Sequence, residues 1–267
     1  MGTSTKRKIL AELNKNKKEI YSFEDILKIS GSKSANAVRV VVSRIVKDKR
    51  LIPLKPGLYL YIPEGYEENW TTSNFWIGAN LVEPYAISFW SALNHWGLTE
   101  QLPNITYIET TKRMRSNQRK VLNNEYRFVR LSKKRLFGIT RIWVANHQVN
   151  ITDPEKTLAD CLAFPEHGGG ISEAAKGLYN YTKENKLNNL VSYTQKMGQP
   201  ALKRLGYLLE LLGISSNEDL EKIKRLVNNP NPAILEPLLP CINVKWSSEW
   251  KLRANVLQKD LLNWKAK

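Results

Sequence analysis

The chain has 267 residues, of which 42% are hydrophobic and 8 are tryptophan, so it can bury a core and is not wholly disordered. Two cysteines, Cys161 and Cys241, exclude a disulfide framework and a cysteine-rich zinc site. The 41 Lys and Arg exceed the 25 Asp and Glu, and the net charge of +16 favours a polyanionic partner such as nucleic acid.

The sequence also predicts a cytoplasmic protein that does not enter a membrane. No apolar run approaches the roughly 18 residues of a membrane span. Residues 6–8 are basic, but only three apolar or small residues follow them before Glu12, so no signal-peptide core is expected. Two cysteines in unrelated contexts fit reduced thiols, as the cytoplasm keeps them.

Three helices are predicted in the first fifty residues. Apolar spacing predicts a helix over residues 5–16. A second helix begins after Ser22, a suitable N-cap with Asp25 three residues later, and ends at Gly31. A third helix is predicted over residues 32–47, and its buried stripe consists of Val38, Val41, Val42, Ile45 and Val46.

A hairpin follows the three helices. Residues 51–54 and 58–61 are strand-like, and Lys55-Pro56-Gly57 forms the turn between them. Three helices and a hairpin predict a winged helix-turn-helix, in which the second helix of the pair enters the major groove of DNA. The alternative is a winged helix that contacts protein.

The charge of this first segment favours DNA. Residues 1–63 carry 14 Lys and Arg against 5 Asp and Glu, a net charge of +9. Asn36 can pair with adenine through two hydrogen bonds, whereas basic side chains contact phosphates and position the domain. The residues predicted to contact DNA are Ser32, Lys33, Ser34, Asn36, Arg39, Ser43, Arg44, Lys47, Lys49, Arg50 and Lys55.

A breaker-rich linker over residues 63–68 predicts a domain boundary between residues 63 and 64. In the second domain, Asp153 and Pro154 predict a helix start, and Cys161 fits the buried stripe of that helix rather than a nucleophile. The expected strands are 105–109, 126–131, 139–144 and 242–246. The other expected helices are 74–81, 87–96, 171–181, 188–196, 200–212, 217–226 and 256–262.

The predicted fold class is therefore α+β. A winged helix-turn-helix over residues 1–63 precedes a larger mixed α/β domain over residues 64–267. That second domain is expected to be helical from about residue 153.

Several stretches of the chain, in order, resemble the AbiEi family of antitoxins. Residues 44–60 (RIVKDKRLIPLKPGLYL) resemble the family's basic helix and Gly-Leu-Tyr wing. Residues 85–99 look like the helix that begins its second domain, and a Thr-Lys-Arg turn follows at residues 111–113. Residues 149–158 are similar to its later helix entry, and the match is least clear beyond Asn185.

AbiEi-type proteins are antitoxins of bacterial type IV toxin–antitoxin and phage abortive-infection systems. The resemblance implies that the winged helix represses the shared promoter by binding its inverted repeats in double-stranded DNA. Two copies of the chain are expected to cover one inverted repeat. It implies that the residue 64–267 domain counters a nucleotidyltransferase toxin, encoded by the next gene, without a stable complex. The family brings no catalytic residues, metal or cofactor. The alternatives are a stand-alone winged-helix regulator without a toxin and a DNA nuclease with a winged-helix specificity domain.

A second basic concentration lies outside the winged helix. Residues 112–141 carry eleven Lys and Arg and one acid, Glu125. Such a run is either a solvated face or a second polyanion surface, which could hold flanking DNA or an RNA that the toxin modifies. The residues assigned to this surface are Lys112, Arg113, Arg115, Arg119, Lys120, Lys133, Lys134 and Arg135.

Three features resemble enzyme sites, but each lacks a partner that the chemistry needs, so no catalytic residues are predicted. Residues 166–170 (EHGGG) resemble a lipase oxyanion loop, but the chain has no Gly-x-Ser-x-Gly turn, and a flexible loop between helices is expected. Glu109 and Lys112 end a strand as in nucleases, but they are three apart, whereas nucleases space them two apart after a separate Asp. The histidines are too far apart in sequence to predict a metal site: His95, His147 and His167.

Overall fold

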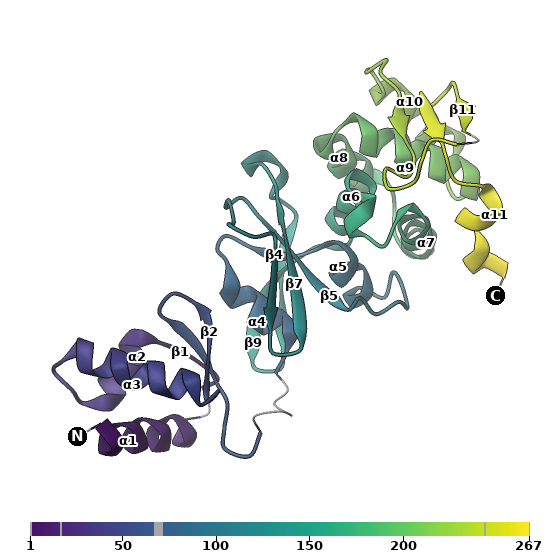
Figure 1. Cartoon of the computed structure of the whole chain (residues 1–267). Helices are drawn as coiled ribbons and strands as arrows, with labels where there is room; N and C mark the ends of the chain where they lie inside the picture. Colours follow the sequence, from purple (N-terminus) through teal and green to yellow (C-terminus); the bar gives the residue numbers. More distant parts are fainter. Residues whose placement is uncertain (1, 17, 67–71, 243, 267) are drawn as a thin grey trace. The chain divides into compact units, whose positions relative to one another are not determined.

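The computed structural model describes residues 2–16, 18–66, 72–242 and 244–266. The chain divides into two compact units, Met1–Leu81 and Val82–Lys267, and both contain helices and strands (Figure 1). The predicted α+β class is therefore confirmed.

The boundary between the units lies after Leu81 rather than between residues 63 and 64. The reason is that helix α4 (Asn74–Leu81) packs against strand β2 (Leu51–Lys55) and so stays with the first unit. Of the predicted linker, residues 67–68 lie outside the described residues.

Three helices and a three-stranded antiparallel sheet form the body of the first unit. The sheet has the strand order β1-β3-β2. Strand β1 was not predicted, because a three-residue strand has no periodicity of its own and is recognised only by its pairing with β3. The elements are α1 (Gly2–Lys15), β1 (Ile20–Ser22), α2 (Phe23–Ser30), α3 (Ala35–Lys47), β2 and β3 (Leu58–Tyr61).

The core of the first unit joins all three helices to the sheet. Ile9 and Leu13 of α1 and Ile26 of α2 are fully buried. The valine stripe of α3 packs between them, and Val38 and Ile45 are 0% exposed. Valine and isoleucine favour helices only weakly, so this burial is what stabilises α3.

A six-stranded mixed sheet forms one layer of the second unit, in the order β6-β7-β5-β4-β9-β8. The neighbouring strands β5 and β7 are parallel, with Ile108 opposite Phe128 and Thr110 opposite Arg130. The strands are β4 (Ala86–Ile87), β5 (Ile105–Thr110), β6 (Gln118–Val121), β7 (Asn124–Arg130), β8 (Ile139–Val144) and β9 (His147–Thr152).

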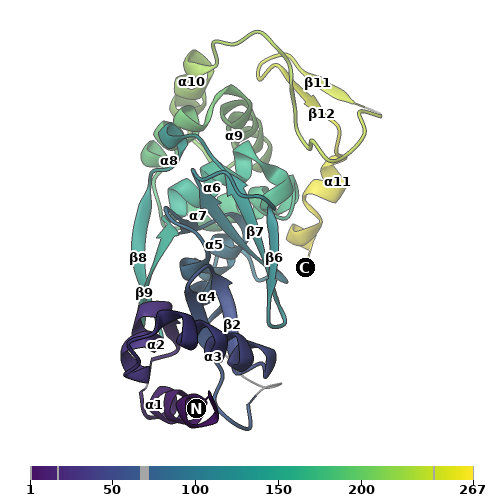
Figure 2. The ribbon, with the colours of Figure 1, turned by 60° about the vertical axis from the view of Figure 1, so that its left-hand side comes forward.

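Helices pack on this sheet and on one another (Figure 2). Helix α5 (Phe89–His95) contacts β5, and α6 (Pro154–Ala163) contacts β9, α7, α8 and α9. Asp153 caps α6 and Pro154 starts it, as predicted. The other helices are α7 (Ile171–Thr182), α8 (Asn188–Met197), α9 (Gln199–Leu212) and α10 (Asn217–Leu226), which match their predicted ranges within one residue at each end.

The end of the chain is less helical than predicted. A small sheet, in the order β10-β12-β11, replaces the single expected strand over residues 242–246. Its strands are two or three residues long, so only their pairing defines them. The elements are β10 (Ala233–Ile234), β11 (Lys245–Ser247), β12 (Leu252–Ala254), α11 (Gln258–Leu261) and the 3₁₀ helix η3 (Asn263–Ala266).

Two further expectations are corrected. The helix predicted from residue 87 begins at Phe89, because Ile87 pairs with both β5 and β9. Residues 166–170 are not an open loop: they begin within η2 (Pro165–His167), and a Cβ added at Gly168 or Gly169 would overlap Cys161 or Trp90. In the described part of the chain, no helix combines the length and the apolar character needed to cross a membrane.

Candidate nucleic-acid interface

The turn before α3 decides which residues that helix presents. Gly31 ends α2 with a left-handed backbone (φ 65°). Ser34, not Ser32, is the N-cap of α3, and its hydroxyl accepts a hydrogen bond from the Ala37 N–H at 3.3 Å. The helix therefore begins at Ala35, three residues later than predicted, and Ser32 and Lys33 lie in the turn.

The outward face of α3 is a continuous polar and basic stripe. Asn36, Ser43, Arg44 and Lys47 are all exposed, and Val40 between Asn36 and Ser43 brings the spacing along this face to three or four residues. Val40, which is not among the predicted contact residues, lies on the same face and is 54% exposed. Its place outside the buried valine stripe was the signal that could have identified it. An exposed apolar side chain here can contact a thymine methyl group, so the face combines polar, apolar and basic contacts.

Arg39 forms a hydrogen bond with the side-chain amide of Asn36. An Arg39 guanidinium nitrogen donates a hydrogen bond to Asn36 Oδ1 at 3.0 Å, and the guanidinium lies 5.3 Å from the centre of the Phe23 ring. The Phe23 ring supports the guanidinium, and the hydrogen bond holds Oδ1 of the Asn36 amide toward Arg39. Asn36 must release Arg39 or rotate before it can make two hydrogen bonds to adenine.

Arg50 does not contribute to this surface. Its Nε donates to the Ile62 carbonyl oxygen at 2.9 Å, another guanidinium nitrogen donates to the Tyr61 hydroxyl at 3.2 Å, and its side chain is 12% exposed. The prediction that Arg50 contacts phosphate is therefore wrong, because these bonds tie the end of α3 to the sheet.

The hairpin tip is tied to the helices rather than extended away from them. The Gly57 carbonyl oxygen accepts a hydrogen bond from the Phe23 N–H at 2.7 Å. Lys55, beside the tip, is half-buried, and Lys49 is exposed in a left-handed turn (φ 58°). Lys49 and Lys55 thus flank α3, while its own stripe forms the centre of the interface.

The second basic concentration divides into three parts in the structure. Because β5 and β7 are parallel and end together, the segment after β5 and the 3₁₀ helix η1 (Lys133–Arg135) leave the same edge of the sheet. The exposed residues at this edge are Lys112, Arg113, Arg115, Lys133 and Lys134, here called the sheet-edge cluster. Arg119 and Lys120 lie instead along β6, opposite Tyr126 and Glu125.

Arg135 belongs to neither surface group. It is half-buried, and its guanidinium lies 5.8 Å from the centre of the Phe164 ring. Its positive charge acts on the buried carboxyl of Asp160. The prediction that Arg135 lies on the second basic surface is corrected, because its side chain turns toward the helices.

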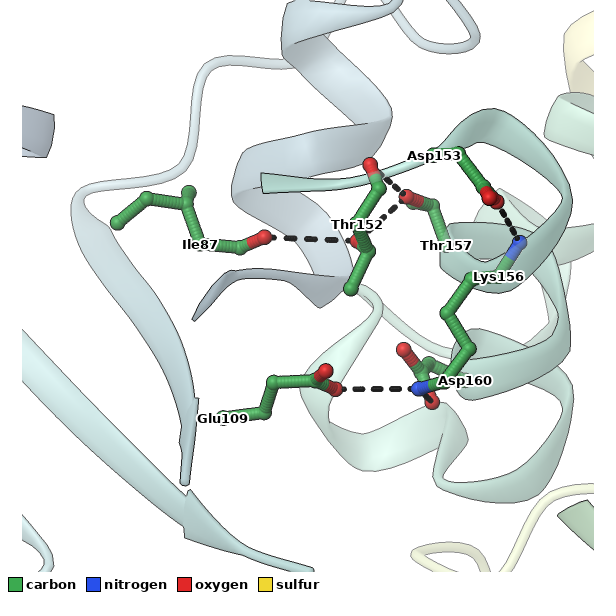
Figure 3. Close-up of polar contacts among 7 residues, drawn as sticks. All are labelled: Ile87, Glu109, Thr152, Asp153, Lys156, Thr157 and Asp160. Atoms are coloured by element: carbon green, nitrogen blue, oxygen red, sulfur yellow. Dashed lines mark hydrogen bonds and ion pairs between the residues drawn. The ribbon is translucent and has the colours of Figure 1, made fainter. Parts of the chain in front are cut away.

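Three ionisable side chains meet in the interior of the second unit (Figure 3). Lys156 Nζ lies 3.2 Å from Glu109 Oε2 and also pairs with Asp160 Oδ1, and all three side chains are 0% exposed. Burial, together with the negative charge of Asp160, raises the pKa of Glu109 well above its usual value. Burial alone lowers the pKa of Lys156, but the two carboxylates outweigh this effect and raise it.

This buried cluster stabilises the fold and is closed to a substrate. It links β5 to α6, and Phe137 lies 5.1 Å from the ammonium. Glu109 therefore faces Lys156, whereas Lys112 is exposed, so the two residues do not form the nuclease pair considered from the sequence. The sequence pattern that could have revealed the cluster is a Lys–Asp pair four residues apart within the apolar stripe of α6.

Cys161 is fully buried beside this cluster, and burial raises the pKa of its thiol, so its predicted place in the core is confirmed. Over the described ranges, no group of three or more His, Cys, Asp and Glu side chains is placed to hold a metal ion.

No family model matches the chain, and no curated protein matches it. Among solved structures, it is similar to the crystal structure of the RV2827C protein from Mycobacterium tuberculosis. The TM-score is 0.71 at 16% identity, and the match covers 99% of this chain and 95% of that chain. At this identity the similarity concerns the fold alone.

Proposed function

We propose that the chain is a cytoplasmic, DNA-binding transcriptional repressor and the antitoxin of a type IV toxin–antitoxin system. The DNA-binding part rests on the outward stripe of α3, where Asn36, Val40 and Arg44 combine contacts for base edges, thymine methyl groups and phosphates. The element order α1-β1-α2-α3-β2-β3 supports a winged helix-turn-helix as the DNA-reading module.

On this proposal, two copies bind an inverted repeat, each with α3 in the major groove. Arg44, Lys47 and Lys49 neutralise phosphates while Asn36 reads a base. If about six phosphates are neutralised in all, the affinity falls as roughly the fifth power of the salt concentration.

Two substitutions on α3 separate base reading from phosphate contact. Asn36→Ala is expected to reduce the preference for the operator over scrambled DNA by about 1–3 kcal/mol, because it removes a paired contact to one base. Arg44→Ala is expected to weaken binding to the operator and to scrambled DNA alike. It should also reduce the slope of log affinity against log salt concentration by about one. Gel-shift titrations with the DNA upstream of the gene, at several salt concentrations, measure both effects.

Lys222→Ala is the matched control, since this lysine is exposed on α10 in the other unit. A salt-independent affinity would contradict the phosphate contacts. The reverse pattern, with Arg44 setting the base preference, would mean that α3 lies in the groove the other way round.

The antitoxin part of the proposal rests on the resemblance to AbiEi-type proteins and on the sheet-edge cluster. The adjacent reading frame separates it from a stand-alone repressor: a small nucleotidyltransferase there supports an antitoxin. The cluster places five cations at one edge of the sheet, where they suit the phosphates of an RNA that such a toxin modifies.

Neutralising the sheet-edge cluster is expected to impair rescue from the toxin. The variant replaces Lys112, Arg113, Lys133 and Lys134 by Ala in the full chain, which is co-expressed with the toxin while growth is scored. A charge-matched control replaces Lys186, Lys222, Arg225 and Lys259, which are exposed elsewhere in the same unit. Full rescue by the cluster variant, at an equal protein level, would exclude a role for the cluster in neutralisation.

A further inference from the structure

A cavity of about 720 Å³ opens in the second unit, and none of the DNA-contact or sheet-edge residues named above lines it. Helix α7 forms one wall, and the chain after α5 and the C-terminal η3 complete it. The residues that line it are Glu100, Gln101, Glu173, Lys176, Tyr179, Asn180, Lys183, Asn263, Trp264 and Lys265.

Hydrogen bonds hold the three walls together. The Ser172 hydroxyl donates to the Leu261 carbonyl oxygen at 3.0 Å and so ties α7 to the C-terminal segment. Asn180 Nδ2 donates to the Leu98 carbonyl oxygen at 3.2 Å and ties α7 to the chain after α5. At the floor, Glu173 is buried and accepts a hydrogen bond from the Thr99 hydroxyl. The cavity is therefore part of the packed structure of the unit.

Two aromatic rings and two ammonium groups share one side of the cavity. The Tyr179 and Trp264 ring centres lie 5.4 Å apart at 53°. The ammonium nitrogens of Lys183 and Lys265 lie 4.7 Å and 4.8 Å from the Tyr179 ring centre. Lys265 also lies 5.8 Å from the Trp264 ring centre.

The cavity has a small excess of positive charge, because three lysines line it against Glu100 and Glu173. Lys176 pairs with Glu100, whose carboxylate also interacts electrostatically with Lys183, but no carboxylate in the described ranges forms an ion pair with Lys183 or Lys265. Lys183 instead donates a hydrogen bond to the neutral amide oxygen of Asn180 at 3.1 Å. Two ammonium groups over aromatic rings in a concave site attract an anion.

The remaining polar groups suit a ligand larger than a simple anion. Gln101 and Asn263 each present an amide, which both donates and accepts hydrogen bonds. Aromatic stacking, a cation for phosphate and amides for base or sugar edges are the contacts by which proteins hold single nucleotides.

We propose that this cavity binds a nucleoside phosphate, either free or at the end of a single strand. Lys183 and Lys265 move toward the phosphate, and their movement uncovers Tyr179 and Trp264 for stacking with the base. This site is independent of the DNA-reading stripe on α3, because its residues all belong to the second unit.

Calorimetric titration of the full chain tests this site. The ligands are adenosine monophosphate, cytidine monophosphate, a 5′-phosphorylated tetranucleotide, adenosine and inorganic phosphate. We expect saturable binding of the mononucleotides or of the tetranucleotide, and adenosine and phosphate alone should bind at least tenfold more weakly. Binding of mononucleotides indicates a free nucleotide as the ligand, and binding of the tetranucleotide alone indicates a strand end.

Substitutions locate the binding in the cavity. Lys183→Ala with Lys265→Ala should weaken binding at least about tenfold, as expected for loss of contacts to a charged group. Trp264→Leu should weaken the binding of the nucleotides but not that of inorganic phosphate. Lys186→Ala with Lys222→Ala is the charge-matched control and should bind the nucleotides like the wild type. The melting temperature confirms that each variant is folded. Absence of saturable binding, equal binding of inorganic phosphate, or unchanged affinity in the Lys183/Lys265 variant would overturn the proposal.

Discussion

Replacing Lys156 by Met is expected to lower the free energy of unfolding of the second unit by about 3–5 kcal/mol. Methionine fills a similar volume but carries no charge, so Glu109 and Asp160 lose their shared cation while both remain 0% exposed. An uncompensated carboxylate in the interior is among the costliest defects of a core. Denaturant titration followed by tryptophan fluorescence measures the loss, because six of the eight tryptophans lie in residues 82–267.

Glu109→Gln is the matched control for the buried cluster. The raised pKa of Glu109 means that the folded state holds a proton which the unfolded state releases above its ordinary pKa of 4.5. The wild type therefore loses stability as the pH rises from 4.5 toward the raised pKa, and the neutral amide removes this loss. The stability of the Glu109→Gln variant relative to the wild type should therefore increase as the pH rises through that interval. A difference that does not change with pH would mean that Glu109 is ionised in the folded protein.

Replacing Gly206 by Ala is expected to destabilise the second unit by about 3 kcal/mol, although the same change in an exposed helix stabilises it by about 1 kcal/mol. Gly206 lies within α9, and an added Cβ would overlap the ring of Trp250. That ring is 0% exposed, and its Nε1 donates to Glu210 Oε2 at 2.6 Å, so it cannot move without leaving its site. The midpoint of thermal unfolding measures the effect.

A double substitution shows whether the ring is the cause. In a chain that carries Trp250→Leu, which leaves room beside α9, Gly206→Ala should cost much less than in the wild type. Equal costs in the two backgrounds would mean that the glycine is needed for another reason.

Local signals in the sequence predicted much of the fold because they act over only a few residues. Ser22 with Asp25, Gly31, and Asp153 before Pro154 all occupy the predicted caps. Side-chain and backbone groups of neighbouring residues make these bonds, so the pattern is complete within one turn of helix. Helices α7 to α10 have their own apolar periodicity and were found with similar bounds.

Short strands could not be predicted in this way. Strands β1, β4, β10 and β12 have two or three residues, and each is defined by hydrogen bonds to a distant segment. Strand β6 has three successive polar residues, Gln118 to Lys120, and so lacks the alternation of a half-buried strand. Strand β9 does alternate, with Val149 and Ile151 buried, and was missed although this signal was present. The domain boundary was placed too early for the same reason, since the contact of α4 with β2 joins segments about twenty residues apart.

The sequence by itself determined the charge of the chain, the helix caps and the basic stripe of α3, because residues near one another in the chain produce these features. Only the tertiary structure decided what the charged side chains do. It turned Arg50 and Arg135 inward, separated Arg119 and Lys120 from the sheet-edge cluster, and brought Glu109 to Lys156 across 47 residues. It also brought Lys183 and Lys265 to one tyrosine. A charge acts according to its burial and its neighbours in space, and a count along the chain contains neither.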